Sequence, residues 1–89
     1  MEQVIYRIKN ETNQEDKISS LIEPIIENLG YLIVQVKIND HEGVLQIMLE
    51  KINSELNFDD CKKISNNIMP LIEINNLLSE DYRIEISSP

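Results

Sequence analysis

The residues able to do chemistry are few and stand apart in the sequence. His41 is the only histidine and Cys61 the only cysteine, so no internal disulfide can form. A metal site needs several convergent ligands, and His41 has no cysteine or second histidine near it. A nucleophilic Cys61 would need a neighbouring base and a lowered thiol pKa, which a helix N-terminus can supply only in part. We expect His41 to be a solvated turn residue and Cys61 a small core residue.

Two acidic pairs could serve acid–base catalysis or bind a divalent cation. Asp59-Asp60 follows Asn57 at the expected start of a helix, where the helix dipole favours negative charge. Glu80-Asp81 precedes a strand, as turn residues do. Neither pair has the ligand spacing of a calcium loop, and glycine-rich phosphate loops and CxxC pairs are absent from the sequence. We predict no catalytic residue, no metal site and no cofactor.

The charge balance bears on the kind of partner. Eight lysines and arginines stand against sixteen acidic residues, which gives a net charge of -8 over 89 residues. RNA affinity depends largely on neutralising phosphates, so little direct RNA binding is expected from this chain. An acidic surface suits a basic partner, or simply keeps the chain soluble. No apolar run approaches the roughly 18 residues of a membrane span, and the first residues do not resemble a signal peptide, so a cytoplasmic location is expected.

A first helix is predicted after a polar break at residues 10–14. The apolar residues that recur at helical spacing are Ile18, Leu21, Ile22, Ile25, Ile26 and Leu29. Thr12 and Glu15 have the spacing of a capping box, and Gly30 suits the left-handed end of a helix. Pro24 predicts a kink on the exposed side rather than two helices.

Two strands and a second helix follow. Residues 31–39 alternate, with Leu32, Val34, Val36 and Ile38 on the predicted apolar face. Residues 45–50 alternate in the same way, and the short turn at 40–43 predicts an antiparallel hairpin. Asn57 is the expected N-cap of a helix interrupted near its end by Pro70. The residues expected to be buried on this helix are Phe58, Cys61, Ile64, Ile68, Leu71 and Ile72. A third strand alternates Tyr82, Ile84 and Ile86 with polar residues.

The order α-β-β-α-β predicts an α+β domain with two helices on one face of a three-stranded sheet. The opposite face of the sheet would carry Gln35, Lys37, Gln46, Met48, Glu50, Arg83 and Glu85, a polar set of mixed charge. We assign residues 15–89 to this domain and residues 1–14 to an N-terminal arm. In that arm, Val4, Ile5 and Ile8 would suit a helical turn, and Tyr6 and Ile8 would equally suit an extended segment.

Three stretches resemble the RimP family of bacterial ribosome maturation factors. They are Leu21-Ile22-Glu23-Pro24-Ile25-Ile26-Glu27-Asn28-Leu29-Gly30-Tyr31, Asn57-Phe58-Asp59-Asp60-Cys61-Lys62-Lys63-Ile64-Ser65 and Tyr82-Arg83-Ile84-Glu85-Ile86-Ser87-Ser88-Pro89. Family members have a helix that ends in Leu-Gly-Tyr or Leu-Gly-Phe, a second that opens with a Leu-Asp-Asp-Cys type motif, and a strand that ends in Ser-Ser-Pro-Gly. The resemblance runs from about Ile18 to Pro89.

The resemblance implies a cytoplasmic protein that binds the immature small ribosomal subunit and assists its assembly without catalysis. It also implies a C-terminal β-barrel domain that this chain does not include, with Ser87, Ser88 and Pro89 at the domain junction. Phe58 stands where the family usually has Leu, which is a conservative change.

Combining charge and resemblance, we expect a monomer that contacts the small subunit through a basic ribosomal protein. The candidate contact residues are Glu23, Glu27, Glu50, Asp59, Asp60 and Glu85. The alternative is an acidic interaction or dimerisation module unrelated to ribosomes, pairing through an exposed sheet edge and the face that carries Met48. An enzyme would need a buried polar cluster with perturbed titration.

Overall fold

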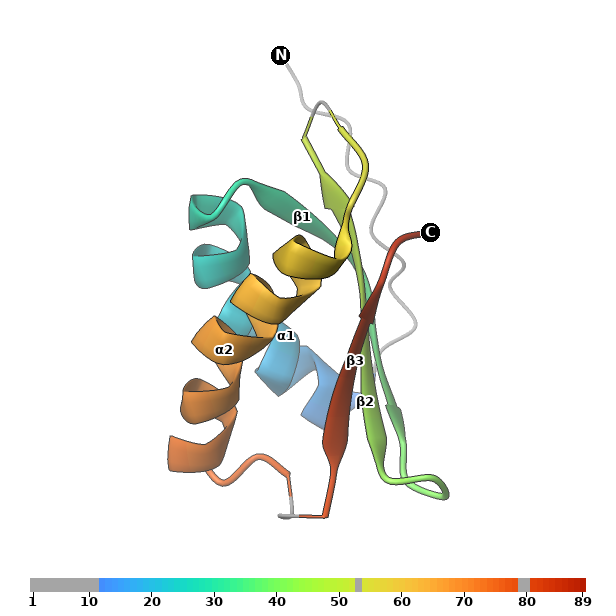
Figure 1. Ribbon diagram of the computed structural model, residues 1–89. Helices are drawn as coiled ribbons and strands as arrows, with labels where there is room; N and C mark the ends of the chain where they lie inside the picture. Colours follow the sequence, from blue (N-terminus) through green and yellow to red (C-terminus); the bar gives the residue numbers. More distant parts are fainter. Residues whose placement is uncertain (1–11, 53, 79–80) are drawn as a thin grey trace.

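Two helices cover one face of a three-stranded sheet, which confirms the predicted fold class (Figure 1). The computed structural model describes residues 12–52, 54–78 and 81–89. The elements in chain order are α1 (Asn13–Asn28), β1 (Tyr31–Asn39), β2 (Val44–Lys51), α2 (Phe58–Ile74) and β3 (Arg83–Ser87). The interpretations of residues 1–11 lie outside the described residues.

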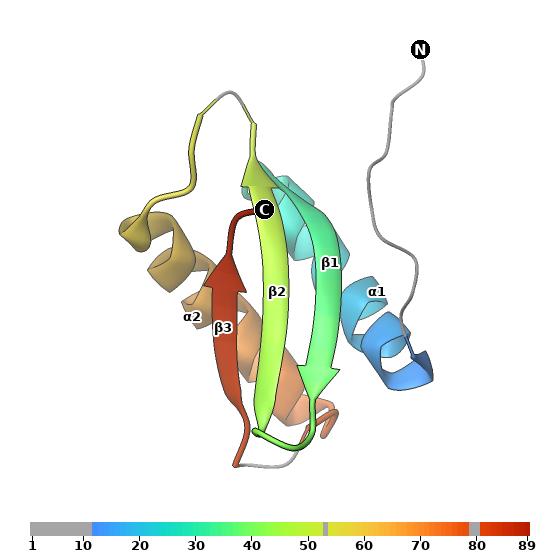
Figure 2. The same ribbon diagram turned by 90° about the vertical axis from the view of Figure 1, so that its right-hand side faces the viewer.

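The sheet is mixed, with the strands in the order β1-β2-β3 (Figure 2). The hairpin pairs β1 and β2 antiparallel, as predicted, and α2 then carries the chain back so that β3 lies parallel to β2. Two edges result, one along β1 and the other along β3. Neither helix covers the other face of the sheet, which is turned toward the viewer in Figure 2 and is called the open face below.

The predicted apolar face of β1 is wrong in the first half of the strand. Tyr31 and Ile33 are buried there, and Leu32 is 42% exposed. The pairing register shifts between Ile33 and Gln35, which is a β-bulge. Because a bulge inserts one extra residue, the side chains that follow it change face, so Val36 points into the core as expected.

The signals that bound α1 are confirmed. Thr12 is the N-cap, and its side chain and that of Glu15 form a complete capping box. Pro24 is exposed within one continuous helix, so its ring meets solvent rather than the core. Gly30 has a φ of +98°, a conformation that glycine adopts without a Cβ penalty.

In α2, Asn57 is the N-cap as predicted, but two other expectations fail. Phe58 was expected in the core and is 80% exposed. It lies six residues before Ile64, and this spacing turns its side chain about 120° away from the buried stripe of the helix. Pro70 does not interrupt the helix, which continues to Ile74 with Pro70 on its exposed side.

The core lies between the helices and the sheet. Its buried residues are Ile18, Ile22, Ile26, Tyr31, Ile33, Val36, Leu45, Ile47, Leu49, Ile64, Ile68 and Ile72. Leu77 and Leu78 pack against one end of it, as predicted. Within the described residues, no helix is long and apolar enough to cross a membrane.

One carboxylate near the N-terminus of each helix also binds the sheet. Glu15 accepts from the backbone N–H of Thr12 (2.8 Å) and from that of Ile38 in β1 (2.6 Å). Asp60 occupies the corresponding position in α2 and forms a reciprocal capping box with Asn57. Glu15 and Asp60 are each only 6% exposed. These two carboxylates therefore fix where each helix starts relative to the sheet.

Asp60 joins three elements. One carboxylate oxygen accepts from the Tyr31 hydroxyl at 2.5 Å, and the other accepts from the Lys51 ammonium at 3.0 Å. The hydrogen bond from Tyr31 and that from the Asn57 amide lower the pKa of Asp60 to about 2, and Lys51 adds to the effect. The same contact, with burial, raises the pKa of Tyr31 to about 12. The Asp60 carboxylate thus connects the start of β1, the end of β2 and the start of α2.

We predict that Asp60→Asn lowers the melting temperature by about 5–10 °C, because it removes the anionic end of the capping box and of the Tyr31 and Lys51 contacts. The folded pKa of Asp60 lies below that of a free aspartate, so its stabilisation is present above about pH 4 and is lost as the pH falls through about 2. Thermal melts of both proteins from pH 7 to pH 2 should show their difference shrinking in acid.

Asp59→Asn is the matched control, because Asp59 is the exposed neighbour and loses the same charge. It should shift the melting temperature by less than about 3 °C. A difference between Asp60→Asn and the unchanged protein that persists undiminished at pH 2 would contradict the assigned role.

Candidate functional site

The structure gives no support to the nucleophile reading of Cys61. Its thiol is partly buried, and the sulfur lies 3.7 Å from the backbone oxygen of Ile86 in β3. Burial, and then the neighbouring Asp60 charge, raise the pKa of Cys61. A raised pKa lowers the thiolate population at neutral pH, and the thiolate is the reactive form. Cys61 therefore acts as a packing residue between α2 and β3.

His41 lies exposed in the turn between β1 and β2, as predicted. The described residues contain no group of three or more His, Cys, Asp or Glu side chains that could hold a metal ion. Of the acidic pairs, Asp60 has the structural role given above, and Asp81 lies exposed in a turn before β3.

The six predicted contact residues do not form one surface. Glu27 is exposed on α1, and Glu23 lies half-buried beside it. Glu50 and Glu85 are exposed on β2 and β3, on the open face of the sheet that the helices do not cover. The sheet stands between these two groups. A single compact partner cannot contact both without wrapping around the domain.

The remaining two candidates, at the start of α2, differ from each other. Asp59 is exposed, whereas Asp60 is buried and holds Tyr31 and Lys51. A partner could reach Asp60 only by displacing those contacts. Asp59 is thus the member of the pair that a partner can meet.

The open face of the sheet is close to neutral, as its mixed composition predicts. Lys37 and Arg83 balance Glu50 and Glu85, and Arg83 forms an exposed ion pair with Glu85 at 3.3 Å. Surface pairs of this kind contribute about 0–1 kcal/mol to stability. This face alone does not account for the acidity of the chain.

Two segments that are distant in the sequence, each carrying acidic residues, meet at the turn end of the sheet. The hairpin turn carries Asp40 and Glu42, and the Tyr82 hydroxyl donates to Asp40 from 42 residues away. The backbone N–H of Arg83 also donates to the Gly43 oxygen at 3.0 Å, and the backbone oxygen of Asp81 lies 3.6 Å from where a Cβ on Gly43 would be. Only the folded chain brings these segments together.

A second unpredicted feature is a groove between α2 and β3. Its lining at one end comprises Phe58, Cys61, Lys62, Ser65, Asn66, Ile84 and Ile86. Its lining at the other end comprises Met69, Ile72, Glu73, Asn76, Leu78, Tyr82 and Ile84. The sequence signal that could have found this groove is the position of Phe58. It lies six residues before Ile64, which places its side chain off the buried stripe of α2 and leaves it exposed.

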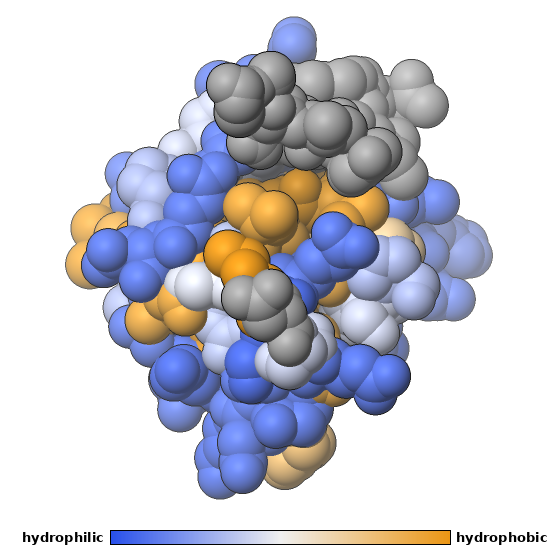
Figure 3. Space-filling view, turned by 90° about the horizontal axis from the view of Figure 1, so that it is seen from above, coloured by the Kyte–Doolittle hydropathy of each residue, from blue (hydrophilic) through white to orange (hydrophobic). Residues whose placement is uncertain are grey.

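The predicted junction residues lie at the end of β3. Ser87 is the last residue of the strand and pairs with Met48 of β2. Ser88 and Pro89 are exposed and line a shallow hollow with Glu50, Lys51 and other residues of the connection after β2. Among the residues coloured in the view from this end, most are hydrophilic and the hydrophobic ones show in a smaller central area (Figure 3).

The family comparison decides which kind of binding domain this is. The family model of the RimP N-terminal domain matches residues 21–89. The chain belongs to the RimP family. RimP proteins are ribosome maturation factors without catalytic activity, and they associate with the immature small ribosomal subunit.

The stretches that resemble RimP include residues that connect the helices to the sheet. Tyr31, which follows the end of α1, and Asp60, at the start of α2, hydrogen bond to each other. The third stretch forms β3, and its Ile86 receives the Cys61 thiol. Tyr31, Asp60, Cys61 and Ile86, which belong to the stretches that resemble RimP, therefore help to hold α2 on the sheet of this RimP domain.

We predict that Cys61 reacts slowly with an aromatic disulfide reagent at pH 7.5. Its rate in the folded chain should be at least about tenfold below that of a free cysteine, because both burial and a raised pKa reduce access to the thiolate. Unfolding in denaturant should restore the ordinary rate. A reaction rate in the folded chain above that of free cysteine would instead support a nucleophilic Cys61. The Cys61→Ser variant measures the background reaction of the reagent.

Proposed function

We propose that this domain serves small-subunit maturation in the cytoplasm by binding a basic ribosomal protein of the immature subunit. The observation that carries this proposal is the charge of -8, with Glu27, Glu50 and Asp59 exposed and with Glu85 exposed in its ion pair with Arg83. Oppositely charged surfaces accelerate encounter and select partners. Many ribosomal proteins are strongly basic, which makes them suitable partners for an acidic surface.

The basic residues argue against RNA as the principal partner of this domain. Lys51 is bound to Asp60, Arg83 is paired with Glu85, and the Lys63 ammonium lies 5.9 Å from the centre of the Tyr31 ring. RNA binding gains its affinity from cations that neutralise phosphates. Three of the cations in the described residues are thus already engaged within the chain.

The side of the domain around β3 is the better of the two acidic surfaces. It combines Asp59 and Glu85 with the exposed ring of Phe58, and protein interfaces draw most of their energy from such apolar anchors surrounded by polar groups. Glu23 and Glu27 on α1 form the second candidate surface. We assign the principal contact to the β3 side.

The test compares three double charge reversals of equal size. Asp59→Lys with Glu85→Lys changes the β3 side, Glu23→Lys with Glu27→Lys changes α1, and Glu42→Lys with Glu55→Lys changes two exposed loop residues as the control. Binding to purified basic small-subunit proteins and to immature subunits is measured at low and moderate salt. The β3-side variant should lose about tenfold or more in affinity and show a weaker salt dependence.

The control should lose less than about threefold, since it changes only the overall charge. Equal losses in all three variants would mean that net charge and not a defined surface governs binding. A loss confined to the α1 variant would move the contact to α1. Absence of saturable binding to every basic protein, even at low salt, would overturn the proposal.

A further inference from the structure

The outer edge of β3 presents backbone groups that do not point at the rest of the sheet. The N–H of Arg83 donates to the Gly43 oxygen, on the β2 side. Since the N–H and C=O of one strand residue point to the same side and successive residues alternate, Glu85 also faces β2. Ile84 and Ile86 accordingly direct their N–H and C=O groups to the outer edge, which pairs with no other described strand and where the Ile86 oxygen already accepts the Cys61 thiol at 3.7 Å. Such an edge is a template for another strand.

Helix α2 overhangs this edge. Viewed toward the open face of the sheet, the first turns of α2 project past β3 on the side away from β2 (Figure 2). A hollow of about 260 Å³ lies there, bounded by Phe58 and Cys61 of α2 and by Ile84 and Ile86 of β3. Phe58 contributes a ring that is 80% exposed. Apolar side chains of an added strand would find a surface of α2 above them.

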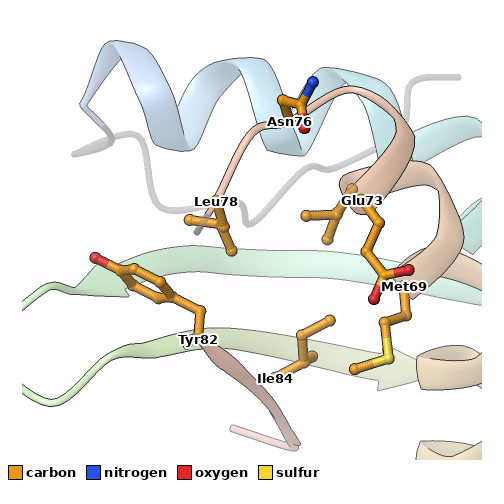
Figure 4. Close-up of a pocket in the computed structure, with 7 residues that line it drawn as sticks. Met69, Glu73, Asn76, Leu78, Tyr82 and Ile84 are labelled. Atoms are coloured by element: carbon orange, nitrogen blue, oxygen red, sulfur yellow. The ribbon is translucent and has the colours of Figure 1, made fainter. Parts of the chain in front are cut away.

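A second hollow lies next to the first, toward the start of β3. This hollow of about 460 Å³ shares Ile84 with the first and is bounded by Met69 and Glu73 of α2 and by Tyr82 (Figure 4). Figure 4 shows Met69 and Glu73 reaching from α2 toward Ile84, with Leu78 and Tyr82 closing the far end. Met69 is 40% exposed. The two hollows thus lie one after the other between α2 and β3, with Ile84 in the lining of both.

The charges beside the groove favour a basic occupant. The acids along it are Asp59 next to Phe58, Glu73 in the second hollow, Asp81 before β3 and Glu85 on β3. The bases are Lys62 in the first hollow and Arg83, which already pairs with Glu85. Four acids stand against two bases, so the surroundings are net negative.

We propose that the outer edge of β3 takes up an extended segment of a basic polypeptide as a fourth strand. The backbone of the segment would hydrogen bond to Ile84 and Ile86, and alternate apolar side chains would enter the groove under α2. Its intervening basic side chains would meet Glu85 on the open face. This inference rests on the proposed function and specifies how the basic ribosomal protein is held.

A second copy of the chain is a poorer occupant of the same edge. Each copy carries a net charge of -8, so two copies repel each other. Antiparallel pairing centred on Glu85 would also place the two Glu85 side chains opposite each other, which is destabilising. Self-association of the chain through this edge would overturn the proposal.

Amide hydrogen exchange gives the most direct test. One probe is the purified basic small-subunit protein that shows salt-dependent binding. The other is a short peptide of alternating lysine and valine, with a peptide of the same composition arranged in two blocks as its control. Both the protein and the alternating peptide should slow exchange of the Ile84 and Ile86 amides by about tenfold or more, and the amides of Arg83 and Glu85 should change little. The block peptide should protect neither edge amide.

Substitutions at the edge supply the second arm. Ile84→Pro removes the outward N–H and leaves the bonds between β2 and β3 in place, whereas Ile84→Val keeps the N–H at a volume close to that of proline. The proline variant should weaken binding about tenfold, and the valine variant less than twofold. Circular dichroism checks that Ile84→Pro folds. If it does not fold, Phe58→Ser is compared with Phe58→Leu instead, because Phe58 is exposed. Only the serine variant should lose binding.

The outcomes separate this inference from the function on which it rests. Binding that is weakened by charge reversal but leaves the Ile84 and Ile86 amides unprotected would retain the proposed function and reject strand addition. Edge protection that appears without a partner and grows with chain concentration would identify a second copy as the occupant, and so reject it too. Absence of binding to any basic protein would reject both.

Discussion

The fold depends on two buried carboxylates that each serve a helix and the sheet at once. An ionised carboxylate is costly to bury unless its oxygens are satisfied by hydrogen bonds or a cation. Glu15 meets this condition with the amides of Thr12 and Ile38, and Asp60 meets it with Asn57, Tyr31 and Lys51. Each carboxylate is satisfied only when its helix starts at one place on the sheet. Apolar packing alone is less selective, because neighbouring turns of an isoleucine-rich stripe resemble one another.

The two carboxylates leave the two edges of the sheet in different states. At the β1 edge, Glu15 accepts the backbone N–H of Ile38, so a side chain of α1 occupies that position. At the β3 edge, α2 contributes the Cys61 thiol to the Ile86 oxygen at 3.7 Å, and a thiol is a weak donor. Asp60, one residue before Cys61, is turned inward to Tyr31. The same contact that anchors α2 thus leaves Phe58 outside the core and β3 available at its edge.

Much of this architecture could be predicted from the sequence because it depends on local patterns. The isoleucine spacing from Ile18 to Ile26 defines α1, and Thr12 and Asn57 mark the helix starts by their own side-chain chemistry. The errors have equally specific causes. The bulge near Val34 shifts by one residue which side chains of β1 face the core. Alternation of apolar and polar residues cannot predict this shift, because Leu32 and Ile33 are both apolar. Phe58 was placed in the core on its residue type, against its angular position.

The binding surface was harder to predict because it depends on segments that are distant in sequence. Asp60 was predicted to be a helix-capping residue and a candidate contact residue, and its hydrogen-bond partner Tyr31 lies 29 residues away in the sequence. The groove needs Phe58 and Ile84 to face each other, and these belong to elements whose order along the sheet the sequence did not specify. At the junction of Ser87, Ser88 and Pro89, the end of the strand could be predicted but its pairing with β2 could not.

An acidic domain with an open strand edge can combine two kinds of recognition that neither feature provides alone. Backbone hydrogen bonds at Ile84 and Ile86 are indifferent to sequence, so an edge by itself accepts many segments and invites aggregation. Carboxylates by themselves attract any cation and are screened within about 10 Å at ordinary salt. Together they admit a segment only if it is extended, apolar on alternate positions and basic between them. The charge of -8 on every copy then opposes self-pairing at the edge, so specificity comes both from what the surface attracts and from what it repels.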